Sequence, residues 1–221
     1  MERIMIRVWD GPLRLFKWGF VFAVTGAVLT GLSGDMELHA RFGFAAGALV
    51  LFRLFWGLVG SETSRFSHFV KGPEATRAYL RDGSWGGLGH NPLGALSILA
   101  LLGLVGFKFA TGLFSNDDIF FDGPWAGWIG KEVSDMLTGW HDQSTPVLYA
   151  VIGLHVAAIF WYYAKGEDLF GPMVIGEKNV EAEDPLVSKA AALHWAPLWR
   201  AAAAAAIALF FAGIAMRYWI T

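Results

Sequence analysis

The sequence contains no cysteine, and charged residues make up only 16% of its 221 positions. Without cysteine, the chain has no disulfide, no thiolate ligand for an iron–sulfur cluster and no attachment point for c-type haem. The formal net charge of −2 gives no reason to expect a nucleic-acid-binding protein, which usually concentrates lysine and arginine on one face. Any metal must be held by histidine, lysine, methionine or a carboxylate.

Hydrophobic residues are abundant instead, at 55% of the chain, and the mean hydropathy is +0.46. These values are typical of membrane proteins rather than soluble globular ones. A helix of roughly 20 residues crosses the hydrocarbon core. Five apolar stretches are long enough for this, at about 13–34, 39–60, 93–115, 138–164 and 198–219. We expect an all-α polytopic membrane protein with one membrane domain over residues 1–221. The segments 61–92, 116–137 and 165–197 are predicted to be loops.

The basic residues predict the orientation, because cytoplasmic loops carry an excess of lysine and arginine. One side is expected to hold the N-terminal segment and the 61–92 and 165–197 loops, and its basic residues are Arg3, Arg7, Arg14, Arg65, Lys71, Arg77, Arg81, Lys165, Lys178, Lys189 and Arg200. The other side has only Arg41, Lys131 and Arg217. The sequence therefore predicts a bacterial inner-membrane protein with a cytoplasmic N-terminus and a periplasmic C-terminus.

Two histidines in the fourth apolar stretch, His141 and His155, are 14 residues apart. This separation is close to four helical turns, or about 21 Å along the axis, and leaves both side chains on roughly one face. One helix could thus offer an axial imidazole to each of two haems at different depths. A single buried histidine is as often a hydrogen-bonded packing residue, but two in one span favour a functional role, because each polar group is costly in hydrocarbon.

A second ligand from another helix must lie at the same depth as each of these histidines. His39 opens the second stretch on the outer side, where it matches the depth of His141. Gly43 and Gly47 follow on the same helical face, so a flat macrocycle could lie against the backbone there. Glycines at this spacing also pack two helices together, which is their commoner meaning in membrane proteins.

The inner half of the first stretch contains no histidine that could match His155, but it does contain Lys17. A lysine near the end of a span ordinarily extends to the interface. A neutral amine also binds iron, and a bound metal would hold the amine in that form. Both interpretations of Lys17 remain open from its position alone.

Three further residues are candidates for binding the peripheral groups of a cofactor. His90 begins the sequence GHNPLG at the entrance to the third stretch, and it is either an interfacial capping residue or a hydrogen-bond donor to a haem propionate or a quinone head group. Arg14 and Arg53 could pair with propionates, because a planar guanidinium suits carboxylates. Each is also readily explained as an ordinary inside-facing basic residue.

Taken together, these residues and motifs resemble the bacterial cytochrome b561 type, a family that includes the b-type subunits of membrane-bound nickel–iron hydrogenases. The similarity rests on VWDGPLRLFKWGF in the first span, His39, GHNPLG, TGLF, His141 and His155, in this order along almost the whole chain. The resemblance implies a four-helix haem-binding bundle plus a fifth transmembrane helix, two b-type haems, and electron exchange between quinone and a c-type cytochrome or a membrane-associated dehydrogenase or hydrogenase.

The chain departs from the family pattern at Lys17, where the first-span motif usually carries histidine before tryptophan. The family pairing then implies His39 with His141 on the outer haem and Lys17 with His155 on the inner haem. Three arrangements of the inner site remain open: Lys/His ligation, a five-coordinate haem held by His155, or no haem. An open coordination position would allow small-ligand chemistry.

The predicted function is electron transfer across the inner membrane between quinone or quinol and a partner redox protein. Whether the chain itself acts as a quinone oxidoreductase stays open at this point. A non-redox transporter is the alternative, with Lys17 and Lys108 on a proton or substrate pathway. A structural anchor subunit of an electron-transfer complex is the third hypothesis, and the haem content would separate all three.

Overall fold

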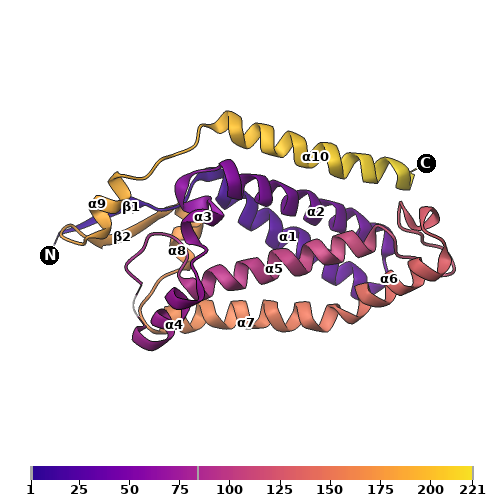
Figure 1. Cartoon of the computed structure of the whole chain (residues 1–221), viewed down its shortest axis with the longest axis horizontal. Helices are drawn as coiled ribbons and strands as arrows, with labels where there is room; N and C mark the ends of the chain where they lie inside the picture. Colours follow the sequence, from indigo (N-terminus) through magenta and orange to yellow (C-terminus); the bar gives the residue numbers. More distant parts are fainter. Residues whose placement is uncertain (1, 84, 221) are drawn as a thin grey trace. The chain divides into compact units, whose positions relative to one another are not determined.

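The computed structural model describes residues 2–83 and 85–220, with side chains up to residue 217. Long apolar helices dominate it (Figure 1): α1 (Gly11–Ser33), α2 (Met36–Val59), α5 (Pro92–Gly112), α6 (Lys131–Gln143) followed by α7 (Thr145–Ala164), and α10 (Leu198–Ile220). Among the described residues, five helical segments are long and apolar enough to cross a membrane, with α6 and α7 counted together. The predicted class, an all-α polytopic membrane protein, is confirmed.

The fourth membrane segment differs from the expected single helix over about 138–164. Its helical part begins already at Lys131, and it is interrupted at Ser144, between α6 and α7. Pro146 lies two residues further on, and proline has no backbone N–H to donate to the carbonyl four residues earlier. The interruption separates His141, on α6, from His155, on α7.

The connecting segments carry more regular structure than the sequence predicted. The 61–92 segment contains the 3₁₀ helix η1 (Glu62–Ser64), α3 (Phe66–Phe69) and α4 (Pro73–Asp82), and the 3₁₀ helix η2 (Ala126–Trp128) precedes α6. The 165–197 segment contains α8 (Phe170–Ile175), strand β2 (Glu177–Glu181) and α9 (Leu186–Ala191). Strand β1 (Arg3–Arg7) pairs antiparallel with β2, with Arg3 opposite Glu181 and Arg7 opposite Glu177.

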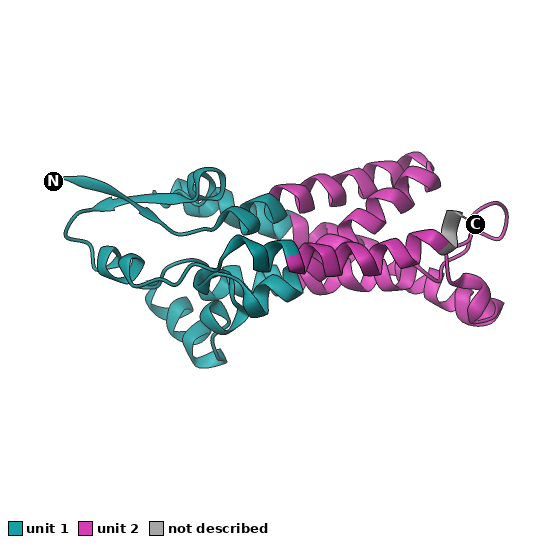
Figure 2. Ribbon diagram, turned by 90° about the horizontal axis from the view of Figure 1, so that it is seen from above, with its two compact units in different colours: residues 1–17, 53–99, 153–202 teal, residues 18–52, 100–152, 203–221 magenta. Residues whose placement is uncertain are grey.

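The chain divides into two compact units, coloured separately in Figure 2. Unit 1 comprises residues 1–17, 53–99 and 153–202, and unit 2 comprises residues 18–52, 100–152 and 203–221. Leu13, Trp56 and Phe69 are almost fully buried in unit 1. In unit 2, Phe44 and Leu113 are buried in one cluster, against which Phe109 packs.

Asp10 joins several parts of unit 1. It is only 2% exposed, and its carboxylate accepts a hydrogen bond of 2.7 Å from the backbone N–H of Leu13, in the first turn of α1. The indole of Trp56 on α2 also donates to this carboxylate, at 3.2 Å, and the hydroxyl of Ser64 donates at 2.7 Å. A helix N-cap is thereby tied to two segments that lie far away in the sequence.

Candidate functional site

Unit 2 brings the imidazole rings of His39 on α2 and His141 on α6 close together. The centroids of the two imidazole rings are 6.0 Å apart, and their planes are inclined by 81°. Both side chains are half-buried. The depth match expected between these two histidines therefore corresponds to a close approach of their rings.

Each of these rings is held through Nδ1 by a backbone carbonyl of a neighbouring helix. His39 Nδ1 lies 2.8 Å from the carbonyl oxygen of Ala27 on α1, and His141 Nδ1 lies 3.0 Å from that of Lys108 on α5. When Nδ1–H donates to a carbonyl, the tautomer is fixed and Nε2 keeps its lone pair. This is the arrangement typical of histidines that bind a metal through Nε2.

A glycine four residues after each carbonyl lets the ring approach the helix. A Cβ atom added at Gly31 would lie 3.0 Å from Nδ1 of His39, and one added at Gly112 would lie 3.2 Å from Cε1 of His141. Such distances are tighter than ordinary van der Waals contact, so any side chain at either position would push the ring away.

A threonine precedes each of these glycines, and its hydroxyl bonds in the same way on both helices. Thr30 donates to the carbonyl of Gly26 and, at 3.2 Å, to that of Ala27. Thr111 donates to the carbonyl of Phe107 and, at 3.2 Å, to that of Lys108. The sequence Thr-Gly-Leu thus occurs at the end of both α1 and α5, and each copy holds one histidine. This repeat was missed in the sequence because three residues are too short to stand out.

The His39 and His141 geometry fits one iron bound between the two rings. Because a metal–imidazole bond is about 2 Å long, two rings at the observed separation could both bind one ion. Perpendicular ring planes and Nδ1 atoms already bonded to carbonyls leave the Nε2 atoms for the metal. No group of three or more histidine and carboxylate side chains suited to another kind of metal centre occurs among the described residues.

Unit 1 contains Lys17 and His155, the other predicted ligand pair. The Nζ atom of Lys17 is buried, has no hydrogen-bond partner among the described residues, and lies 4.0 Å from the centroid of the Trp9 ring. His155 Nδ1 lies 2.8 Å from Ser97 Oγ. A buried amine without a partner and a half-buried imidazole in the same unit suit a metal-bearing group.

Other orphaned polar atoms gather in the same unit. Arg53 is 1% exposed. Both of its terminal guanidinium nitrogens are without a hydrogen-bond partner in the described part of the chain. Its Cζ atom lies 4.7 Å from the centroid of the Phe66 ring. Both ring nitrogens of His90 are also buried without a partner there. Unpaired buried polar groups of this kind are costly, and a carboxylate-bearing cofactor would satisfy them.

The pKa of His90 is held well below its ordinary value. Burial is the main cause, and the positive charges of Lys17 and Arg53 add to it. The ring is therefore neutral, lying between Trp9 and Phe69 with ring centroids 4.5 Å and 4.9 Å away. A neutral imidazole offers one donor and one acceptor to a ligand.

Arg14 has a partner that the sequence did not reveal. Its Nη1 donates to the carbonyl of Val174 at 2.7 Å, which joins α1 to the segment around α8. Its Nε is buried without a partner among the described atoms. Arg14 thus has a structural contact, and its buried Nε–H is a donor that a ligand could use.

The two glycines that follow His39 behave differently from each other. A Cβ added at Gly47 would overlap the ring of Phe109 on α5, whereas one added at Gly43 would meet nothing within 4 Å. Gly47 therefore serves helix packing, which is the commoner meaning of such spacing. Gly43 leaves open space on the face that carries His39.

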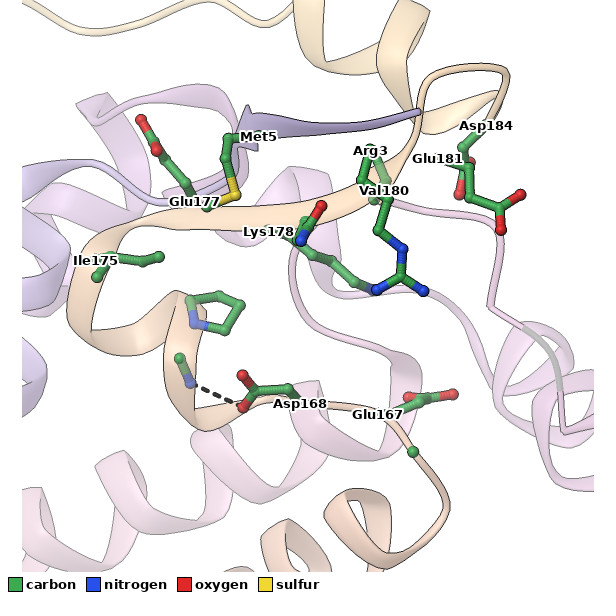
Figure 3. A pocket seen from close by; sticks show the side chains of 14 residues that line it. Arg3, Met5, Glu167, Asp168, Ile175, Glu177, Lys178, Val180, Glu181 and Asp184 are labelled. Atoms are coloured by element: carbon green, nitrogen blue, oxygen red, sulfur yellow. Dashed lines mark hydrogen bonds between the residues drawn. The ribbon is translucent and has the colours of Figure 1, made fainter. Parts of the chain in front are cut away.

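A surface pocket beside the strand pair does not include the predicted ligands (Figure 3). Carboxylates and cations both line it, among them Arg3, Glu167, Asp168 and Lys178. The Asp168 carboxylate accepts the backbone N–H of Gly171 at 2.8 Å and so shapes the turn before α8. Carboxylates and cations are mixed in the lining of this pocket, as on a solvated loop surface. The pocket is therefore not assigned to the cofactor.

One comparison with known proteins gives a match. The family model described as prokaryotic cytochrome b561 matches residues 8–176, which is more than half of the chain and includes all four histidine and lysine candidates. No curated protein and no solved structure matches the chain.

Proposed function

The chain belongs to the prokaryotic cytochrome b561 family, and on that premise we propose that it carries electrons across the bacterial inner membrane through two b-type haems, between quinone and a partner redox protein. Membership makes it a membrane b-type cytochrome. Bound haem would supply reversible one-electron chemistry at its iron. The observation that carries the proposal is the pair of imidazole rings, 6.0 Å apart, with both Nδ1 atoms bonded to carbonyls.

In the proposed outer site, His39 and His141 each present Nε2 to one iron. The carbonyls of Ala27 and Lys108 fix the tautomers and the ring orientations. Because these contacts come from helix backbone, they need no rearrangement when the iron changes its oxidation state. Rigid ligation of this kind favours electron transfer over ligand exchange.

In the proposed inner site, Lys17 and His155 are the iron ligands, and Arg53, Arg14 and His90 bind carboxylate or quinone oxygens. Support comes from buried nitrogens on Lys17, Arg53 and His90 that have no hydrogen-bond partner among the described residues. A guanidinium whose terminal nitrogens are buried without such a partner is costly, and a haem propionate would offset that cost. An amine ligand in place of imidazole would give the two haems different spectra and potentials.

The proposed orientation places the N-terminus and the 61–92 and 165–197 segments on the cytoplasmic side and the C-terminus on the periplasmic side. Quinone would react near one of the two haems, and a c-type cytochrome or a membrane-associated dehydrogenase or hydrogenase would exchange electrons with the other. Support comes from the distribution of lysine and arginine along the chain.

A pyridine haemochrome assay on detergent-purified protein, with oxidised and reduced spectra, tests this proposal. We expect two haems b per chain. His39→Ala and His141→Ala should each remove the same haem, and His155→Ala should remove the other. His194→Ala is the matched control, because this histidine lies in a connecting segment with a side chain that is 86% exposed, and it should keep both haems.

Lys17→Ala and Lys17→His test the inner site separately. We expect Lys17→His to keep two haems and to shift only the spectrum that His155→Ala removes. Lys17→Ala should leave the inner site with a haem held by His155 alone or with no haem. A wild-type protein that takes up no haem when haem is supplied would contradict the cytochrome proposal and leave the transporter or anchor hypothesis.

A further inference from the structure

We propose that Lys108 is a positioning residue that holds the backbone of His141 across the break between α6 and α7. This inference rests on the proposed function, because it concerns how one ligand of the outer haem is oriented. Lys108 lies inside α5 and is half-buried. It takes part in the contacts of His141 through both its backbone and its side chain.

The backbone and the side chain of Lys108 contact opposite ends of His141. The Lys108 carbonyl oxygen lies 3.0 Å from His141 Nδ1, while Lys108 Nζ donates to the His141 carbonyl at 2.7 Å. Nζ also donates to the Thr145 hydroxyl at 2.6 Å. One residue therefore restrains the ring and the main chain of the ligand together.

The His141 carbonyl lies where the helix is interrupted, and side chains supply its donors. Besides Lys108, the hydroxyl of Ser144 donates to it at 2.8 Å, and the hydroxyl of Thr145 approaches at 3.4 Å. In a continuous helix this carbonyl would accept the backbone N–H of residue 145. The lysine amine thus contributes a hydrogen bond at the point where Ser144 separates α6 from α7.

Comparison with His39 shows that the lysine is not needed for holding a ring. The residue that corresponds to Lys108 in the other Thr-Gly-Leu copy is Ala27, whose carbonyl alone bonds His39 Nδ1. His39 lies in the uninterrupted helix α2, whereas His141 lies three residues before a break. The extra amine is therefore present at the ligand whose helix is broken and absent at the ligand whose helix is continuous.

The test uses Lys108→Met, which keeps the length of the side chain but removes the donor, and Lys108→Arg, which restores a donor. The readouts are haem content, the midpoint potential of the outer haem and the ferric low-spin EPR signal, whose g-values report the relative orientation of the axial rings. We expect Lys108→Met to shift or broaden the EPR signal of the outer haem and to change its potential, with Lys108→Arg reversing most of both changes. The inner haem should be unaffected.

Two further variants make the result specific. Thr145→Val keeps the lysine but removes its second hydrogen-bond acceptor. It should shift the EPR signal of the outer haem less than Lys108→Met does. It also tests the proposal if the Lys108→Met protein does not accumulate. Lys131→Met removes an exposed lysine of α6, the helix that carries His141. This lysine pairs with Asp135, and its loss should leave the EPR signal unchanged.

The role of Lys108 and the ligand assignment fail in different ways. If His141→Ala leaves the haem content unchanged, the ligand assignment is wrong. If His141→Ala removes the outer haem but Lys108→Met and Thr145→Val both keep the wild-type EPR signal and potential, the positioning role of Lys108 is overturned.

Discussion

At the scale of single residues, the two outer candidates are held by main-chain atoms that the sequence cannot display. The carbonyl oxygens of Ala27 and Lys108 bond the two rings. Gly31 and Gly112 have no side chain, so the rings can approach the helices there. A carbonyl is common to every residue, so only the glycines leave a trace in the sequence. The ring orientation of each histidine therefore depends on one residue whose defining feature is a missing Cβ.

Gly112→Ala tests this dependence. The new Cβ would lie 3.2 Å from the His141 ring, and we expect the displacement of the ring to destabilise the haem-loaded site by about 1–3 kcal/mol, as overpacking typically does. Gly31→Ala should affect the same haem. Haem content and the visible spectrum are the measurements.

Gly103→Ala provides the control for Gly112→Ala on the same helix α5. A Cβ at Gly103 would meet nothing within 4 Å, so this change should keep both haems and stabilise the helix by up to about 1 kcal/mol. Equal haem loss in the Gly103 and Gly112 variants would show that α5 is sensitive to any change from glycine to alanine, and the specific contact with His141 would not be the cause.

The contribution of Asp10 to stability can be compared with that of Asp35. Asp35 makes the same kind of capping hydrogen bond but has no contacts like those of Asp10 with Trp56 and Ser64. Asp35 accepts the backbone N–H of Leu38 at 3.0 Å in an exposed position, so Asp35→Ala should cost about 1 kcal/mol of unfolding free energy. Asp10→Ala also removes the acceptor of the buried hydrogen bonds from Trp56 and Ser64, which adds about 1–3 kcal/mol. Detergent-based unfolding measurements of both variants test this, and equal losses would contradict a joining role for Asp10.

At the scale of elements, the long helices were predictable and the strand pair was not. Runs of about 20 apolar residues have few alternatives to a membrane helix, so the class follows from composition. Strands β1 and β2 are five residues each, half of their residues are charged, and they lie far apart in sequence. Neither therefore gives a periodic signal. The break at Ser144 was missed because Pro146 lies inside an apolar run that reads as one continuous span.

Ile6→Asp tests whether the strand pair fixes the N-terminal segment. Ile6 is buried at 6% exposure, whereas Met5, its neighbour on the other face of β1, is 49% exposed. Burying a carboxylate without a partner is strongly unfavourable, so the strand should detach and Arg7 should become sensitive to trypsin. Met5→Asp is the control and should stay resistant. Equal cleavage in both variants would mean that β1 is open in the native protein.

At the scale of the whole molecule, the sequence predicted the pairing of His39 with His141 but not the contacts that hold their rings. The depth argument joined His39 to His141, and the structure brings their rings together. Their role as haem ligands stays a prediction, as does that of Lys17 and His155. The buried Asp10, the orphaned guanidinium of Arg53 and the clamp made by Lys108 depend on contacts between distant segments, which no local pattern encodes.

The basic residues are distributed unequally along the chain, and this distribution predicts a topology. The cations assigned to the cytoplasmic side lie in or beside the N-terminal, 61–92 and 165–197 segments, whereas the outer set is Arg41, Lys131 and Arg217. Because the cytoplasmic side retains basic loops, alkaline phosphatase fused after Arg217 should be exported and active, and the same enzyme fused after Glu183 should be inactive. A cytoplasmic reporter such as green fluorescent protein should give the opposite pattern at the same two positions. Activity of the phosphatase at Glu183 would invert the assignment and place Lys17 and His155 toward the periplasm, next to any partner that docks from that side.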